Sequence, residues 1–243
     1  MIPCHGMIQV RDLTKRYGDF TAVDRLSLEA AAGEIFGFLG PNGAGKTTTI
    51  RIIAGLSLPT SGSVLVNGVD VIAEPVRAKA ILGYVPDRPY LYEKLTGREL
   101  LHFVVDLYRK PWSVCEPRAV ELLEYFGLGD WIDARIENLS HGMKQKLVIV
   151  SALVHDPDVL VIDEPMVGLD ALAQRQVRHL LRRLADEGKT VFLTTHTLSV
   201  AEAVCDRIAI INRGRVVASG HTGELKRDSA LEDVFLELTY SEE

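Results

Sequence analysis

A glycine-rich stretch with one lysine and one threonine stands between two apolar runs. It reads Gly40-Pro-Asn-Gly-Ala-Gly-Lys46-Thr47, which has the GxxxxGK[ST] spacing. The glycines let backbone N–H groups close around phosphate oxygens without Cβ clashes, and a helix that begins here adds a favourable partial positive charge. We expect Lys46 to reach the β- and γ-phosphates of a nucleotide and the Thr47 hydroxyl to ligate Mg²⁺. The stretch therefore predicts a nucleotide site.

Two carboxylates follow another apolar run. Val159–Ile162 has the composition of a buried parallel strand, and Asp163 and Glu164 come directly after it. Asp163 is placed to organise Mg²⁺, directly or through water, and Glu164 to accept a proton from an attacking water or to orient it. The alternative is an acidic N-cap for a helix that follows a core strand. The upstream phosphate loop favours the catalytic interpretation.

A histidine follows a further apolar strand. His196 comes directly after Val191–Thr195, so we expect it at the same sheet edge as Glu164. A single histidine is usually structural, but this position favours a γ-phosphate contact that also holds Glu164 and water in place. The other histidines lack the spacing of metal ligands, and we assign them no ligand role; they stand at positions 5, 102, 141, 155, 179 and 221.

The composition is that of an ordinary globular chain. The sequence has 243 residues, a hydrophobic fraction of 47%, a charged fraction of 25% and a net charge of −6. That charge creates no global basic field, so no nucleic-acid partner is expected. Three scattered cysteines indicate free thiols. The apolar runs are far shorter than the ~20 residues of a spanning helix, and no signal peptide is evident. We expect a cytoplasmic protein that reaches a membrane only through a partner.

Strand and helix patterns alternate along the chain. Asn67–Gly68 is typical of a hairpin turn, Thr96 and Glu99 of a capping box, and Ser140 of the N-cap of a helix starting near Met143. Strands are expected within 8–38 and at 63–66, 69–72, 83–86, 159–162, 190–194 and 207–218. Helices are expected at 47–55, 75–82, 98–108, 117–126, 171–186 and 198–204.

This alternation predicts an α/β fold with a mainly parallel sheet that binds ligands at its C-terminal edge. We interpret 1–243 as one domain. Residues 7–90 and 156–220 make a β-rich subdomain and an α/β core, about 91–155 make an inserted helical lobe, and about 221–243 make a C-terminal helical extension.

The order of the motifs resembles that in the nucleotide-binding subunit of ATP-binding cassette (ABC) transporters, over almost the whole chain. The matching segments are Tyr17 for the aromatic that stacks on adenine, Gly40–Thr48 for the Walker A loop, Tyr84–Asp87 for the start of the Q-loop, Leu139–Met143 for the signature, Val159–Glu164 for the Walker B strand, Val167–Asp170 for the D-loop and His196 for the switch histidine.

The resemblance implies a P-loop NTPase core with a mainly parallel sheet, an N-terminal antiparallel β subdomain and an inserted α-helical subdomain. It implies ATP and Mg²⁺ as cofactors, Glu164 and His196 as catalytic residues, and Thr47 and Asp163 as metal ligands. The expected ATP-binding residues are Tyr17, Gly40, Pro41, Asn42, Gly43, Ala44, Gly45, Lys46, Thr47 and Thr48.

The resemblance also implies partners. Two nucleotide-binding subunits, expected as a homodimer, would sandwich two ATP molecules head to tail, each between the Walker A loop of one subunit and the signature of the other. Ser140, His141 and Gly142 would contact the partner's ATP, and Asp170 would belong to the D-loop. An integral membrane transporter subunit would hold the dimer at the inner face of the cell membrane.

Three motifs depart from the family pattern. The signature, usually LSGGQ, is LSHGM, so His141 replaces a glycine and Met143 a glutamine. Asp87 stands where the Q-loop has glutamine, and a carboxylate there could still ligate Mg²⁺ through water. Val167 replaces the usual D-loop serine. The catalytic pair is intact, so we expect an active ATPase.

Two further segments, the MKQKL run and Ser229–Thr239, resemble the export-type branch of the family. The expected function is an ATPase that powers a separate membrane exporter; the alternative is a soluble ABC ATPase that acts as a non-transport assembly or switch module. We hypothesise that Asp87–Leu95 and the start of the helix at 98–108 accept a helix of the membrane subunit. The alternative is that Tyr90, Leu91 and Tyr92 are core residues.

Overall fold

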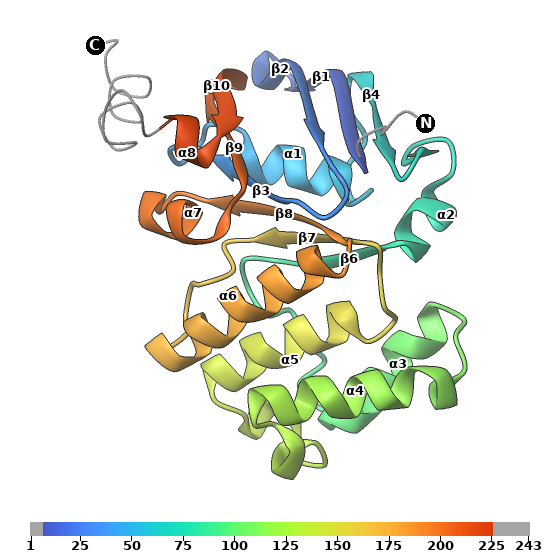
Figure 1. The fold of residues 1–243 in the computed structure, drawn as a ribbon. Coiled ribbons are helices and arrows are strands. Elements are labelled where there is room, and N and C mark those ends of the chain that lie inside the picture. Colours follow the sequence, from blue (N-terminus) through green and yellow to red (C-terminus); the bar gives the residue numbers. More distant parts are fainter. Residues whose placement is uncertain (1–6, 226–243) are drawn as a thin grey trace.

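The computed structural model describes residues 7–225, which form two stacked sheets (Figure 1). The smaller sheet is antiparallel and has the strand order β2 (Phe20–Ala30), β1 (Ile8–Tyr17), β4 (Ser61–Val66), β5 (Val69–Asp70). The larger sheet has the order β10 (Arg215–His221), β9 (Arg207–Asn212), β3 (Ile35–Leu39), β8 (Thr190–Thr195), β7 (Val159–Asp163), β6 (Leu82–Val85). Its strands pair in parallel except β10 with β9. The predicted fold class is confirmed.

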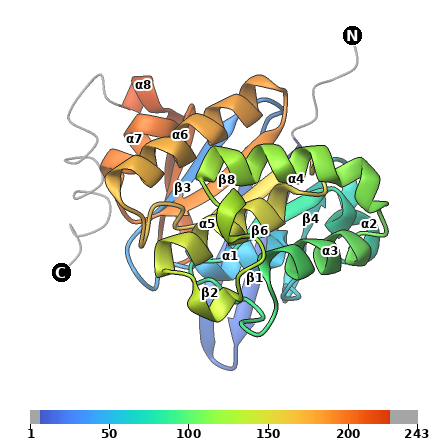
Figure 2. The same cartoon turned by 90° about the horizontal axis from the view of Figure 1, so that it is seen from below.

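Helices occupy both faces of the larger sheet. Helix α1 (Lys46–Ile53) lies between the two sheets (Figure 1). Seen from below, helices α3, α4, α5 and α6 cover the opposite face (Figure 2). The bounds of the remaining helices are α2 (Pro75–Ala80), α3 (Gly97–Leu107), α4 (Trp112–Phe126), α5 (His141–Leu153), α6 (Ala171–Asp186), α7 (Leu198–Val204) and α8 (Thr222–Leu225), with short 3₁₀ turns at Gly129–Trp131 and Ile136–Asn138.

The larger sheet separates two hydrophobic cores, because successive side chains of a strand point to opposite faces. In β8, Phe192 belongs to the core shared with α1 and the antiparallel sheet, whereas Val191 and Leu193 belong to the core shared with the helices below. The Phe192 ring stacks on that of Phe36 in β3, with ring centroids 5.5 Å apart. Packing on both faces holds the ends of β3, β7 and β8 in place, and these ends carry the residues that could do chemistry.

Several local signals are confirmed. Asn67 and Gly68 have φ angles of 47° and 74°, and they turn the chain between β4 and β5. Thr96 caps α3, since its side chain accepts a hydrogen bond from the Glu99 N–H while the Glu99 carboxylate accepts one from the Thr96 N–H. Positive φ angles therefore set the turn, and reciprocal hydrogen bonds set the start of α3.

Helix α4 begins earlier than predicted, at Trp112 rather than Pro117. Pro111 is the N-cap, and Pro117 lies inside the helix. Proline cannot donate the backbone hydrogen bond of an interior position, which disfavours this arrangement. However, α4 buries Cys115 and Ala119 against the helical core, and this burial offsets the lost bond.

Four other boundaries also differ from the predictions. Strand β5 ends at Asp70 because the Asp70 carboxylate accepts hydrogen bonds from the N–H groups of Ile72 and Ala73, which turns the chain. Helix α2 ends at Ala80, so β6 begins at Leu82, one residue before the predicted strand. Helix α5 begins at His141, two residues before the predicted start.

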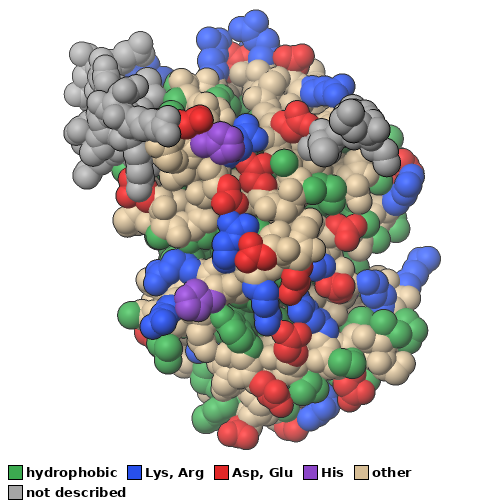
Figure 3. Space-filling model, in the orientation of Figure 1, with side chains coloured by type: hydrophobic (Ala, Val, Ile, Leu, Met, Phe, Trp, Pro, Cys, Tyr) green, Lys and Arg blue, Asp and Glu red, His purple; other side chains and the backbone are tan. Residues whose placement is uncertain are grey.

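Three further features are the C-terminal segment, the absence of a membrane-spanning helix among the described residues, and the distribution of surface charge. Of the predicted C-terminal extension, only α8 falls within the structure; the segment Ser229–Thr239 lies outside the described residues. No helix within residues 7–225 is long and apolar enough to cross a membrane. Lys and Arg side chains are interspersed with Asp and Glu over the face shown in Figure 3, without a large area of one sign.

Candidate nucleotide site

A pocket of about 410 Å³ lies at the carboxyl ends of β3, β7 and β8. It brings together residues from several distant segments of the chain, as expected for ligand sites of a parallel sheet. Its walls are Tyr17, Phe20, Ala22, Asn42, Gly43, Gly45, Lys46, Thr47, Thr48, Asp87, Asp163, Glu164 and His196.

The loop between β3 and α1 depends on glycine at two positions. Gly45 has φ 110°, and a Cβ there would lie 2.5 Å from the carbonyl oxygen of Ala22. A Cβ at Gly40 would clash with the carbonyl oxygen of Ile211. The loop is closed by a hydrogen bond of 3.2 Å from the Ala44 N–H to the Pro41 carbonyl. Carbonyl oxygens of β2 and β9 thus occupy the space that a Cβ would need at Gly45 and Gly40. Any larger residue at these two positions would change the conformation of the loop.

Lys46 is buried at the first position of α1, with 7% of its surface exposed. Its ammonium donates hydrogen bonds to the carbonyl oxygens of Gly40 at 2.5 Å and Pro41 at 3.0 Å. Burial lowers the pKa of Lys46, and the carboxylates of Glu164 and Asp163 oppose that shift. A phosphate oxygen would be a stronger acceptor than these neutral carbonyls, because the hydrogen bond would then join two charged groups.

Asp163 is almost fully buried at the end of β7. One carboxylate oxygen accepts a hydrogen bond from the Thr194 hydroxyl, and the other has no partner within the described part of the chain. Burial raises the pKa of this carboxyl; the Asp87 and Glu164 carboxylates raise it further, while the Thr194 hydroxyl and, more weakly, the Thr47 hydroxyl lower it. An unpartnered buried oxygen beside a hydroxyl and further carboxylates is the kind of oxygen set that Mg²⁺ prefers, so the residues fit this ion.

Glu164 follows Asp163 in a left-handed conformation, with φ 51°, that non-glycine residues seldom adopt. Its Oε1 accepts a hydrogen bond from the His196 N–H at 3.0 Å and lies 2.6 Å from His196 Nδ1. The Thr195 hydroxyl donates to Oε2 at 3.2 Å. Three contacts from the end of β8 therefore fix this carboxylate in the pocket wall, where it could take a proton from water.

Two aromatic rings form the open end of the pocket. Tyr17 and Phe20 are 53% and 63% exposed, and they face each other as a cross-strand pair next to the turn between β1 and β2. Tyr17 is among the residues expected from the sequence to bind ATP, whereas Phe20 is not. The pairing across the short turn at Gly18–Asp19 is the signal that could have found it. Exposed rings at a pocket mouth can stack on a planar base.

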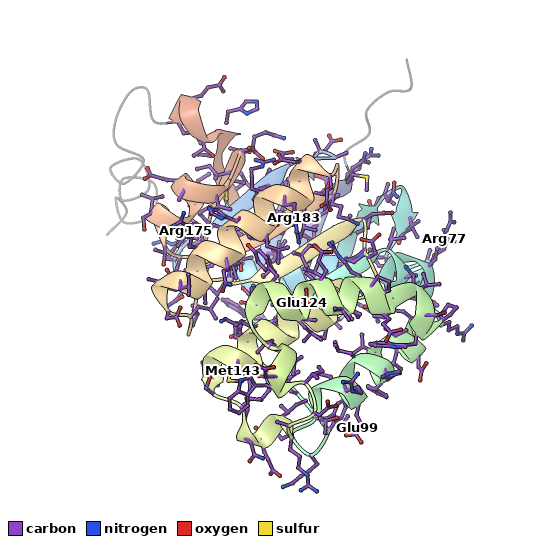
Figure 4. All side chains as sticks on the ribbon, turned by 60° about the horizontal axis from the view of Figure 1, so that its bottom comes forward. Arg77, Glu99, Glu124, Met143, Arg175 and Arg183 are labelled. Carbon is purple, nitrogen blue, oxygen red and sulfur yellow. The ribbon has the colours of Figure 1, made fainter. Side chains whose placement is uncertain are left out.

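The residues of the LSHGM signature lie elsewhere. Of the described residues, Ser140, His141, Gly142 and Asp170 are absent from the pocket wall. Ser140 caps α5 by accepting a hydrogen bond from the Met143 N–H at 3.3 Å, and Asp170 caps α6 by accepting one from the Ala173 N–H at 2.8 Å. Met143 and Arg175, each within the first five residues of its helix, lie on the same side of the molecule (Figure 4). The two capped helix ends therefore form an exposed edge, which we name the signature edge (Ser140–Gly142 and Val167–Asp170).

The segment Asp87–Leu95 exposes its two tyrosines. Tyr90 and Tyr92 are 75% and 62% exposed, and the Tyr92 ring meets the Phe103 ring of α3 edge-on at 5.5 Å. Leu91 is half-buried against the helical core. The alternative that both tyrosines are core residues is wrong, whereas Leu91 does pack inward.

Comparison with known proteins agrees with this geometry. The family described as ABC transporter matches residues 23–167. The daunorubicin/doxorubicin resistance ATP-binding protein DrrA of Streptomyces peucetius is 43% identical over 219 residues, which cover 90% of this chain and 66% of that protein. The probable multidrug ABC transporter ATP-binding protein YbhF of Escherichia coli is 37% identical over 246 residues, 98% of this chain and 42% of that protein. The chain thus spans about two fifths to two thirds of the length of these relatives.

Solved structures show the same architecture. An ATP-binding subunit of an ABC transporter superposes with a TM-score of 0.91 at 33% identity, covering 96% of this chain and 99% of that one. The ATP-binding cassette MJ0796, in a dimer bound to ADP and Pi, superposes with a TM-score of 0.80 at 28% identity, covering 89% and 99%. The family match, the relatives and the shared fold lead to one conclusion: this chain is a member of the ABC transporter family.

Proposed function

We propose that this chain binds and hydrolyses ATP and thereby powers a separate integral membrane transporter that works as an exporter. The observation that carries the proposal is the fixed Glu164–His196 pair in the same pocket as a glycine-dependent loop and a buried lysine. A general base, a phosphate cradle and a buried cation in one pocket are what phosphoanhydride hydrolysis requires.

In this proposal the loop Gly40–Thr48 wraps the phosphates of ATP. Lys46 exchanges its two loop carbonyls for phosphate oxygens, and the Tyr17 ring stacks on the adenine. Thr47 and Asp163 would hold Mg²⁺, and Asp87 would hold it through water. The bound ion would neutralise charge on the phosphate oxygens.

Glu164 acts as the base for the attacking water. Its contacts with His196 and Thr195 hold the carboxylate in one orientation, so little rearrangement is needed when water arrives. The imidazole of His196, half-exposed beside it, contacts the γ-phosphate and keeps the carboxylate and the water aligned. Both residues are therefore proposed as catalytic.

The signature edge acts on a second subunit. Ser140, His141 and Gly142 lie outside this chain's own pocket, while the capped N-terminus of α5 suits an anion brought from outside. We assign these residues to the partner's ATP in a homodimer, and Asp170 to the contact between subunits. The dimeric ADP- and Pi-bound relative supports this assignment.

A membrane subunit completes the assembly. The names of the relatives, drug resistance and multidrug transport, support an exporter at the inner face of the cell membrane. We place its docking surface at Asp87–Leu95 and the start of α3, because Tyr90 and Tyr92 are exposed there. The division into a core (7–90 and 156–220), a helical lobe (91–155) and a C-terminal extension (221–243) is part of this proposal. Unchanged membrane recruitment after Tyr90→Ala and Tyr92→Ala in a folded protein would refute the docking surface.

The deciding experiment measures the ATPase rate per subunit against protein concentration in excess Mg-ATP. We expect a rate that rises as dimers form. Glu164→Gln should lower it by about 100- to 10,000-fold, because the general base is lost, while ATP binding persists and a dimer accumulates. Glu124→Gln, exposed on α4 (Figure 4), is the matched control.

The alternative function is a non-transport assembly or switch module. If the wild-type ATPase rate stays at background at every protein concentration, the result favours this module over an ATPase that powers a transporter. If Glu164→Gln remains monomeric in excess Mg-ATP, the ATP sandwich is wrong.

A further inference from the structure

His141, the signature residue that replaces a glycine of the family pattern, lies against Gly168 in the loop between β7 and α6. A Cβ built on Gly168 would lie 2.5 Å from Nε2 of His141 and 2.7 Å from its Cδ2, so the ring fills the space that a side chain at 168 would need. A Cβ on the next residue, Gly142, would lie 3.7 Å from the Gly168 carbonyl oxygen. The first turn of α5 therefore contacts this loop through the His141 ring, and Gly142 lies beside the same loop.

The loop that His141 contacts is anchored on both sides. The Val167 N–H donates to the Glu164 carbonyl at 3.2 Å, and the Gln174 side chain of α6 donates to the Leu169 carbonyl at 3.1 Å. Asp170 then caps α6. A displacement of Gly168 would thus shift the backbone of Glu164, which lies only four residues away along the chain and is hydrogen-bonded to Val167.

We propose that His141 is a positioning residue that ties the signature to the Val167–Asp170 loop within one subunit. This inference rests on the proposed function. The ring makes the two segments of the signature edge move together, so engagement of a partner's ATP by Ser140 is transmitted through Gly168 to Glu164 of the same subunit. A glycine at 141 would leave the two segments without this side-chain contact.

A double-mutant cycle on kcat tests the contact. His141→Gly deletes the ring, and Gly168→Ala displaces it, since an exposed ring can rotate away from a new methyl group. We expect each change to lower kcat about tenfold by misaligning the site. The double variant should be no worse than the worse single variant, because both remove the same contact. His141→Gln, which keeps a long planar side chain, should restore most of the rate.

Two controls separate this role from a general structural one. Gly68→Ala introduces a methyl group at φ 74°, close to the 76° of Gly168, with nothing within 4 Å, so it reports the backbone cost alone and should leave kcat unchanged. Binding of ATP to the monomer should also be unchanged in all signature-edge variants.

The outcomes are distinct. If the double variant loses about a hundredfold in kcat, the two single effects multiply, and the contact between His141 and Gly168 is not the cause of the losses. A Gly168→Ala variant with wild-type kcat would lead to the same conclusion. Either result leaves the proposed ATPase standing. A wild-type protein that neither dimerises nor hydrolyses ATP would overturn both.

Discussion

The nucleotide pocket and the signature edge are built in opposite ways. In the pocket, Asp163 and Glu164 lie where β7 ends and Lys46 lies where α1 begins, and each of the three has fixed partners. At the signature edge, Ser140 and Asp170 are exposed, and their hydrogen bonds serve only to cap helices. Contacts within the chain fix the pocket groups, whereas the edge offers groups that need a second molecule to act on.

This difference separates affinity from assembly. A change at a pocket residue that contacts the phosphates or the base should alter how one subunit binds ATP, whereas a change at the edge should leave that binding unchanged and alter what two subunits do together. Substitutions on the two sides therefore provide a direct check of the comparison.

The largest effect on ATP binding is expected from Lys46→Ala. It removes the buried cation from the phosphate loop and should weaken ATP binding to the monomer about 100-fold, since charged hydrogen bonds to phosphate are lost. Equilibrium binding of a fluorescent ATP analogue measures this. Lys94→Ala, at a lysine whose side chain is 81% exposed, is the control and should bind normally. Retained affinity in Lys46→Ala would show that the pocket is not where ATP binds.

A smaller effect is expected at the aromatic end of the pocket. Tyr17→Ala should weaken ATP binding about tenfold, within the range found for stacking between an aromatic ring and a base. Phe20→Ala should weaken it less. The same binding assay with ATP and with inorganic triphosphate distinguishes base stacking, because triphosphate affinity should not change. If Phe20→Ala has the larger effect, the roles of the two rings are exchanged.

At the signature edge, Ser140→Ala should leave ATP affinity of the monomer unchanged. It should lower the free energy of unfolding by about 1 kcal/mol through loss of the helix cap, which for a chain of this size lowers Tm by roughly 2–4 °C. Dimer formation in the Glu164→Gln background should weaken, as size-exclusion chromatography with Mg-ATP would show. A fall in the monomer's ATP affinity would contradict the separation of the two regions.

The subtlest effect concerns stability and pH at Asp163. Burial holds its pKa above the unfolded value of 3.8, so the folded state disfavours the charged form. The folded state is therefore not destabilised by this group below pH 3.8; the destabilisation develops as pH rises from 3.8 to the raised pKa, and it is complete above that pKa. Asp163→Asn should therefore stabilise the ligand-free protein at neutral pH, in contrast to Ser140→Ala, while weakening Mg²⁺-dependent ATP binding. Thermal melts from pH 4 to pH 8 check this, and an equal Tm for Asp163→Asn and wild type at neutral pH would refute it.

The same contrast explains what could be predicted from the sequence. The loop around Lys46 and the strand ending in Asp163 and Glu164 carry local patterns, and the parallel sheet then brings them together. The sequence does not decide whether Tyr90 and Tyr92 are exposed, because their exposure depends on what packs over the segment Asp87–Leu95. The contact of His141 with Gly168 joins residues far apart in sequence, at the ends of two helices, and no local pattern indicates it. Likewise, the start of α4 at Trp112 depends on tertiary burial that outweighs an interior proline.

The division of β8 between two cores has a consequence for unfolding. Phe192 packs into the core above the larger sheet, and its neighbours Val191 and Leu193 pack into the core below it. Because the two cores share this sheet, neither core can open without exposing the other. The helices below the sheet and the antiparallel strands above it should consequently melt in a single calorimetric transition. Amide protons of β3, β7 and β8 should exchange with deuterium only through that global event, while those of the exposed loops exchange locally.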